Sequence, residues 1–320
     1  MAPLWLPVVA LVPALIAQTP APSPKQLAAR DFALEDCECI VFADLAQLRE
    51  REIWRLLRAS VLMLALPPLE KEAGFPLEHL DRMTLQARMP ADDAKDAREA
   101  ERAPATTCVL EGNTGLALPD AVARNTSYTR SKVGDVELFE RGDDVVANVR
   151  PDFRVLGTRE LIVPVLEGKR SRGQPSADVL SLLSGRGDNL LYIVCQVKTA
   201  RMRERMLGRL IGQVAWPEDD LPTHMMVRLR AIGEDDDAHL QIEAVIRHRV
   251  GKAGFDASAA AVRAWLESMQ KERRFAAIKD LWRSVEIGHE GSDLVLRKDL
   301  GRPRDAIGAL AVLLAAILGH

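Results

Sequence analysis

The pattern of apolar and polar positions in the first half of the chain predicts strands that alternate with helices. A continuous apolar run over residues 39–43 is typical of a strand, and the leucines of residues 45–57 recur at helical spacing. Asp44 stands between the two and is expected to cap the helix. The remaining elements predicted in this half are strands over 82–89, 106–111, 136–140, 145–149 and 154–157 and a closing helix capped by Thr158.

The second half repeats this order of elements. Its helix over 257–271 has the clearest pattern, because apolar residues recur there at helical spacing, at Val262, Trp265, Leu266 and Met269. Pro303 is expected to begin the last helix, since the first helical position needs no backbone N–H. The other predicted elements are a strand over 190–197, a helix over 200–214, strands over 225–232 and 239–249, and a hairpin over 285–300.

This repeated order predicts an α+β protein with an internal duplication. Each half reads strand, helix, strands, helix, hairpin and helix. That order suits two similar lobes, each a mostly antiparallel sheet with helices packed on one face. A polar, glycine-containing stretch over 169–175 separates the halves, so we expect a first α+β lobe over 34–172 and a second over 173–320. The pattern leaves open whether the lobes share one sheet.

The first residues have the properties of an export signal. Residues 4–17 form an uninterrupted apolar run of signal-peptide length, and small and polar residues follow it. We therefore expect a signal peptide over 1–18, a Pro/Ala-rich linker over 19–33, and an exported protein of the periplasm, the cell envelope or the extracellular space. The alternative is an uncleaved anchor, but the run is shorter than the roughly 20 residues that span a bilayer.

The chain ends in a second apolar run, over 306–319. As a helix this run would be about 21 Å long, which falls short of the ~30 Å hydrocarbon core of a bilayer. Burial against a sheet is therefore favoured. Membrane association through this C-terminal helix is the alternative, because Arg302 and Arg304 would suit a membrane boundary.

Composition narrows the class of partner. Hydrophobic residues make up 48% and charged residues 28% of the 320 residues, which is typical of a globular protein. The formal net charge is −3. Nucleic-acid binding needs a basic excess that displaces the counterions of the phosphates, so the charge argues against a nucleic-acid partner.

The four cysteines allow one candidate disulfide. Cys37 and Cys39 would point the same way from one strand, about 7 Å apart, which disfavours a bridge between them. A bridge between Cys39 and Cys108 is the candidate. Cys195 lies within the predicted strand over 190–197, where a buried free thiol is expected.

Motifs for known chemistry are missing from the sequence. It contains no G-x-S-x-G, H-E-x-x-H, P-loop or C-x-x-C pattern, and its histidines do not recur at the spacing of metal ligands. We therefore assign no catalytic, cofactor-binding or metal-binding residue. The candidate anionic-ligand surface is one side of the predicted helix over 200–214, formed by Lys198, Arg201, Arg205 and Arg209. A solvated helix face is the favoured alternative, because charge runs usually have that role.

Four short segments of the chain resemble a set of bacterial proteins. They are residues 40–48 (IVFADLAQL), 72–84 (EAGFPLEHLDRMT), 134–139 (GDVELF) and 155–158 (VLGT). On these segments the chain is similar to the uncharacterised exported two-lobed α+β proteins that are common in planctomycete bacteria. The resemblance implies export and a duplicated fold over most of the mature chain, and it implies no catalytic residue.

These patterns favour a non-catalytic binding or structural protein of the cell envelope. Its expected partner is another envelope protein, an anionic ligand or an apolar ligand, and no cofactor is expected. Two alternatives belong to other classes. One is a hydrolase whose site is assembled from residues distant in the sequence, and the other is a carrier of an apolar ligand that uses the concave face of the sheet.

Overall fold

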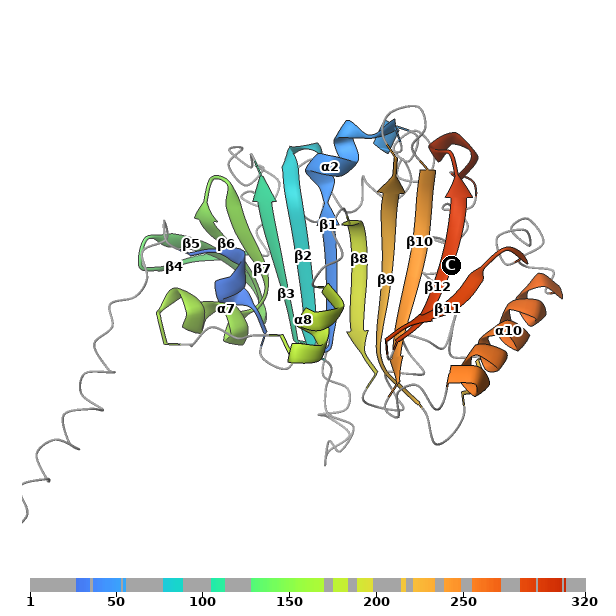
Figure 1. Ribbon diagram of the computed structural model, residues 1–320. Helices are drawn as coiled ribbons and strands as arrows, with labels where there is room; N and C mark the ends of the chain where they lie inside the picture. The colour runs from blue at the N-terminus through green and yellow to red at the C-terminus, as the bar shows by residue number, and fades with distance from the viewer. Residues whose placement is uncertain are drawn as a thin grey trace, which may run out of the picture.

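The computed structural model shows an α+β fold built on one large antiparallel sheet (Figure 1). It describes residues 27–34, 37–52, 54–55, 77–88, 105–112, 128–169, 175–183, 189–197, 214–216, 221–233, 239–248, 255–271, 283–291, 293–306 and 308. Within these residues the sheet has 12 strands, and their order is β11-β12-β10-β9-β8-β1-β2-β3-β7-β6-β5-β4.

The strands predicted from the sequence are present in the predicted order, whereas β4 and α8 were not predicted. The strands are β1 (Cys39–Asp44), β2 (Leu80–Arg88), β3 (Ala105–Gly112), β4 (Thr129–Val133), β5 (Val136–Arg141), β6 (Asp144–Arg150), β7 (Phe153–Thr158), β8 (Asn189–Gln196), β9 (Pro222–Ile232), β10 (His239–His248), β11 (Glu286–Glu290) and β12 (Asp293–Gly301). The helices are η2 (Ala29–Phe32), α2 (Leu45–Glu50), η3 (Leu77–His79), α7 (Arg159–Leu166), α8 (Ala177–Leu183) and α10 (Phe255–Lys271).

The middle of the sheet is the antiparallel pair formed by β1 and β8. Cys39 lies opposite Cys195, and two steps further along the strand Val41 lies opposite Ile193. Strands β1 to β7 lie on one side of this junction and strands β8 to β12 on the other (Figure 1). The two halves of the chain therefore share one continuous sheet, which answers the question that the sequence pattern left open.

Helices lie on both faces of the sheet, so the expectation of helices on one face is wrong. Val179 and Leu182 of α8 pack against the face that carries Met226, and Figure 1 shows α8 in front of the sheet. Helix α10 packs against the face that carries Met225. Met225 and Met226 are neighbours in β9, and neighbouring residues of a strand point to opposite faces. We call the two faces the α8 face and the α10 face.

The described part of the predicted linker over 19–33 contributes to the core: Leu27, Asp31, Phe32 and Ala33 are buried, whereas Arg30 is exposed. Leu27 is 4% exposed and Phe32 is 2% exposed. The ring of Phe32 lies 5.9 Å from the ring of Phe153, centroid to centroid, and both side chains pack with Ile162 of α7. The prolines and alanines suggested a linker, but burying two large apolar side chains outweighs that composition.

One of the two predicted helix caps is confirmed and the other is wrong. Asp44 caps α2 as predicted, because its Oδ1 accepts a hydrogen bond from the Gln47 backbone N–H at 2.9 Å. Thr158 precedes α7, but its hydroxyl accepts from the Thr106 backbone N–H at 3.4 Å and so joins β7 to β3. The two strands approach closely here. Gly157 has a φ of +149°, and a Cβ at that position would lie 2.1 Å from the Thr106 carbonyl oxygen.

Several predicted segments lie outside the described residues. They are the signal peptide over 1–18, most of the helix over 200–214, and nearly all of the apolar C-terminal run. Of the helices in the described part of the chain, none combines the length and the apolar character needed to cross a membrane.

Candidate functional site

A row of apolar side chains crosses the sheet on the α10 face. Each member lies directly opposite the next in the strand register, and residues directly opposite each other point to the same face. From β5 to β11 the row consists of Phe139, Val146, Leu156, Cys108, Leu85, Val41, Ile193, Val227, Ala244, Leu296 and Ile287. We call it the apolar row.

Helix α10 covers the end of the apolar row on β9, β10, β12 and β11. Leu296 is buried against this helix, and Val227, Ala244 and Ile287 pack against the same cluster. Leu85, Val41 and Ile193, at the middle of the sheet, are half-buried, as are Val227, Ala244 and Ile287. The apolar row is therefore partly accessible at the middle of the sheet, where β2, β1 and β8 lie side by side.

The residues above and below these three positions are also apolar or carry a thiol. In each strand the residues two positions before and after point to the same face, so three strands contribute three side chains each. The register aligns them as Ala87, Cys39 and Cys195 in one line, Leu85, Val41 and Ile193 in the next, and Met83, Ala43 and Leu191 in the third. We call these nine residues the central patch.

The central patch contains no charged residue, and most of its side chains are partly accessible. Ala43 and Cys195 are buried, whereas the other seven members are half-buried. Ala43, Met83 and Leu191 pack with the core cluster that contains Leu45 and Leu48 of α2, so the accessible part consists of the other two lines. A contiguous apolar surface that stays accessible to water is a usual mark of an interaction site. The central patch is therefore our candidate binding surface.

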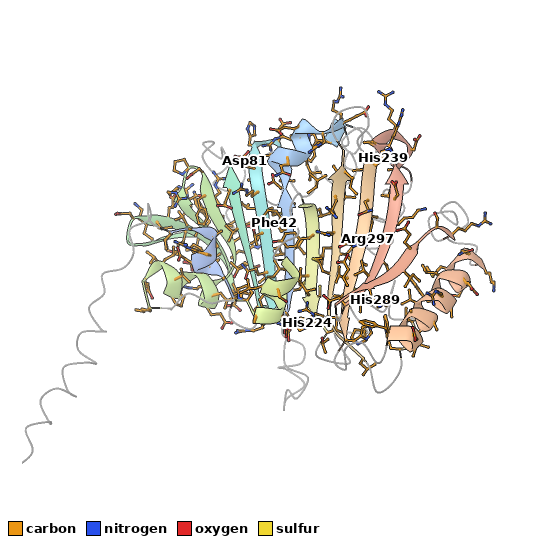
Figure 2. All side chains as sticks on the ribbon, viewed as in Figure 1. Phe42, Asp81, His224, His239, His289 and Arg297 are labelled. Atoms are coloured by element: carbon orange, nitrogen blue, oxygen red, sulfur yellow. The ribbon has the colours of Figure 1, made fainter. Side chains whose placement is uncertain are left out.

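The α8 face carries a row of charged side chains that compensate one another. Arg228 donates to Glu243 across β9 and β10, with its Nη2 at 2.7 Å from Oε1. Arg297 of β12 donates from its Nε to the other oxygen of Glu243 at 2.9 Å, and it also pairs with Glu290. Arg297 lies opposite Glu243 in the strand register and so shares its face, and Figure 2 labels Arg297 in this half of the sheet. Two arginines are thus paired with two glutamates. The row therefore carries no net positive charge that could attract an anion.

Glu243 is held ionised although it is fully buried. Burial alone would raise the pKa of this carboxyl, but the hydrogen bond from Arg297 and the charges of Arg228 and Arg297 outweigh burial, and the pKa lies below its ordinary value. A carboxylate that accepts from two arginines on two different strands ties β9, β10 and β12 together. We therefore assign this charged row to stability.

A second ion pair anchors α8 to the sheet. Arg247 of β10 forms a two-pronged contact with Asp293 of β12, from Nε to Oδ1 at 2.8 Å and from Nη2 to Oδ2 at 2.9 Å. Its Nη1 also donates to the Ser181 hydroxyl of α8 at 2.7 Å. The hydrogen bond to Asp293 is the main reason that the pKa of Arg247 lies above its ordinary value. This contact positions α8 beside the charged row.

An aromatic pair continues the charged row into the other half of the sheet. Phe42 of β1 and Tyr192 of β8 lie opposite each other, and their rings stack with centroids 4.9 Å apart. Tyr192 lies opposite Arg228 in turn, so the aromatic pair and the charged row form one line across the α8 face. Figure 2 shows Phe42 at the middle of the sheet.

The cysteines are arranged differently from the predicted pairing. Cys39 lies opposite Cys195 with their sulfur atoms 3.2 Å apart, whereas Cys108 lies on β3, two strands away. Two strand spacings amount to about 10 Å, beyond the reach of a disulfide. The predicted bridge between Cys39 and Cys108 is therefore wrong, and Cys195 has a thiol neighbour that the sequence did not indicate.

The neighbouring thiols of Cys39 and Cys195 differ in acidity and in access to solvent. The hydrogen bond from Cys195 lowers the pKa of Cys39, which is half-buried. The same hydrogen bond and burial raise the pKa of Cys195, which is only 1% exposed. Elsewhere, burial raises the pKa of Cys37 to about 11 and that of Cys108 to about 12.

The described histidines are dispersed over the sheet. Figure 2 shows His239 near one end of the strands and His224 near the other. Within the described part of the chain, no three His, Cys, Asp or Glu side chains lie close enough together to hold a metal ion. The proposed basic surface of Lys198, Arg201, Arg205 and Arg209 lies outside the described residues.

The central patch was missed by sequence reasoning for an identifiable reason. Strands β1 and β8 read as nearly continuous apolar runs, so the sequence does not show which of their positions share a face. Only the register places the three alternating sets beside one another. The clearest signal in the sequence was the alternation in β2, where Met83, Leu85 and Ala87 are separated by polar residues.

Comparison with known proteins gives a likeness of fold. No family model matches the chain, and no curated protein matches it. Crystal form III of TP0453, a spirochete protein, aligns with a TM-score of 0.51 and 10% sequence identity over 90% of this chain and 99% of that chain. Crystal form I aligns with a TM-score of 0.49 and 10% identity over 90% and 98% of the two chains. Crystal form IV aligns with a TM-score of 0.48 and 11% identity over 91% of this chain and 98% of that chain. At such low identity the likeness concerns the fold alone.

Proposed function

We propose that this protein is an exported, non-catalytic binding protein of the cell envelope that takes an apolar ligand on the central patch. The observation that carries the proposal is the alignment of three apolar sets from β2, β1 and β8 in one partly accessible, charge-free surface. Export is supported by the uncharged apolar run over residues 4–17.

The chemistry of the central patch favours an apolar ligand over an anionic one. Val41, Leu85 and Ile193 offer only methyl and methylene groups, and each CH₂ group removed from water contributes about 0.8 kcal/mol. A ligand that covers several of these groups therefore gains several kcal/mol without any polar contact. The arginines Arg228 and Arg297 are already paired with glutamates on the opposite face.

A fluorescent fatty acid, cis-parinaric acid, provides the test. We expect the mature protein to bind the probe with saturation, and we expect Ile193→Lys to weaken binding at least tenfold because a charge enters the central patch. Ile232→Lys is the matched control, since Ile232 is 42% exposed at the end of β9, away from the central patch. Equal binding by both variants would contradict the proposal.

A milder variant separates loss of binding from loss of folding. Val41→Thr keeps the β-branched shape that favours a strand and replaces one methyl group with a hydroxyl, so the strand is expected to remain intact. We expect this variant to fold with an unchanged circular dichroism spectrum and to bind the probe several-fold more weakly. Unchanged probe binding by folded Val41→Thr would count against the central patch as the site.

We also propose that the shared sheet arose by duplication of one unit. In the first half β1, β2 and β3 follow one another outward from the middle of the sheet, and β7 and β6 come next. In the second half β8, β9 and β10 follow one another outward, and β12 and β11 come next. The two series run in opposite directions from the β1–β8 junction, as two copies related by a two-fold axis would.

A further inference from the structure

We propose that Cys39 and Cys195 form a disulfide that joins the two halves of the sheet when the protein meets an external disulfide. The two residues lie directly opposite each other on β1 and β8, and their sulfur atoms are 3.2 Å apart. Both residues belong to the central patch, but the inference rests on the cysteine geometry alone and does not require that a ligand binds there.

The backbone geometry at this position suits a bridge. Glu38 and Gln196 are the next residues outward, and the Gln196 N–H donates to the Glu38 carbonyl oxygen at 2.6 Å. Hydrogen-bonded and non-hydrogen-bonded pairs alternate along antiparallel strands, so Cys39 and Cys195 form a non-hydrogen-bonded pair. The Cα atoms of such a pair lie about 4.5 Å apart, within the range that a disulfide spans.

Access and acidity assign a role to each thiol. Cys39 is half-buried and its pKa is lowered by the hydrogen bond from Cys195, so its thiolate is the nucleophile. Cys195 is 1% exposed and is suited to the second, internal step. Closure needs the two sulfur atoms to approach from 3.2 Å to about 2.05 Å, a movement that side-chain rotation supplies.

The reaction is a thiol–disulfide exchange in two steps. The Cys39 thiolate attacks one sulfur of the external disulfide, forms a mixed disulfide and releases one thiolate. The Cys195 thiol then loses its proton to water and attacks the Cys39 sulfur, which expels the second thiolate. The protein loses two electrons and two protons, and the external disulfide is reduced to two thiols.

The other two cysteines lie where they cannot form a disulfide with Cys39 in place of Cys195. The Cys37 thiol is fully buried and donates to the Cys39 carbonyl oxygen at 3.0 Å, so it points toward the backbone. Cys108 is separated from Cys39 by β2. The bridge between Cys39 and Cys195 is therefore selective. It closes the pair of strands through which the two halves of the sheet are joined.

Oxidation of the mature protein by oxidised glutathione tests whether this disulfide forms. We expect one bridge, found by mass spectrometry as a peptide containing Cys39 linked to a peptide containing Cys195. Cleavage after Glu38 separates Cys37 from Cys39 and makes the assignment unambiguous. We also expect the melting temperature to rise by on the order of 5 °C, because the bridge closes a long loop.

Matched variants complete the test. Cys108→Ser is expected to keep the bridge and the rise in melting temperature, whereas Cys39→Ser is expected to lose both while its far-ultraviolet circular dichroism spectrum stays unchanged. A bridge that involves Cys37 or Cys108 in the unmodified protein would overturn the proposal. The proposal would also be overturned if all four thiols could still be titrated after prolonged oxidation of the folded protein.

Discussion

Arg228 and Glu243 face each other across β9 and β10 with their nearest charged atoms 2.7 Å apart, and their side chains are 5% and 0% exposed. A buried carboxylate is costly unless it is paired and hydrogen-bonded, and Arg297 supplies the second contact from β12. The three side chains thus link β9, β10 and β12, which are neighbouring strands in one half of the sheet.

Glu243→Gln is predicted to be strongly destabilising. The substitution leaves two arginines facing a neutral amide, and breaking a buried ion pair costs about 3–5 kcal/mol. Urea unfolding followed by circular dichroism measures the loss. Glu290→Gln is the control, because the Glu290 side chain is 49% exposed and its pairing with Arg297 contributes at most about 1 kcal/mol. Equal losses for the two variants would contradict the role assigned to Glu243.

The stability of the protein is predicted to depend on pH through the same carboxylate. The pKa of Glu243 is lower in the folded protein than the value of about 4.3 that applies to an unfolded chain. Its contribution is therefore fully present above pH ~4.3 and is lost as the pH falls through the folded pKa. The free energy of unfolding, measured from pH 7 to pH 3, should decrease in this window. The decrease should be smaller in Glu243→Gln, and an unchanged profile would contradict the assignment.

Cys39 is predicted to be the first thiol to react with iodoacetamide. It is half-buried and its pKa is lowered, whereas burial raises the pKa of Cys108 to about 12. Short labelling of the reduced, folded protein at pH 8, followed by peptide mass mapping, measures the order. If Cys37 or Cys108 were labelled before Cys39, the prediction that Cys39 is the most reactive thiol would be contradicted.

Gly157→Ala is predicted to disrupt the contact of β7 with β3. The added Cβ would lie 2.1 Å from the Thr106 carbonyl oxygen, so the strands would have to separate, and we expect a loss of at least about 3 kcal/mol. Gly134→Ala is the control, because its Cβ would meet nothing within 4 Å and only its φ of +57° costs about 1–2 kcal/mol. Thermal unfolding distinguishes the two, and comparable losses would show that the approach of β7 to β3 is not decisive.

Much of the secondary structure could be predicted from apolar patterning, because most strands are apolar and turns rich in Gly and Asp separate them. Strand β4 was missed because most of its side chains are polar and it lies at the edge of the sheet. Helix α8 was missed because it spans only seven residues. Short or exposed elements give too little pattern to detect.

The arrangement of the elements could not be predicted in the same way. The neighbours Cys39 and Cys195 are brought together by the pairing of β1 with β8, and this contact joins residues 156 positions apart. The central patch depends on the same register. Local patterning carries no information on which distant strands pair, so the α10 face and the central patch were visible only in the structure.

Native mass spectrometry of the mature protein, purified from the exported fraction of its own cells, tests the proposed binding function most directly. We predict that an apolar molecule co-purifies with the unmodified protein and with Ile232→Lys, and that Ile193→Lys is recovered folded without it. Recovery of the unmodified protein without any bound molecule, or of the same molecule on folded Ile193→Lys, would contradict binding at the central patch.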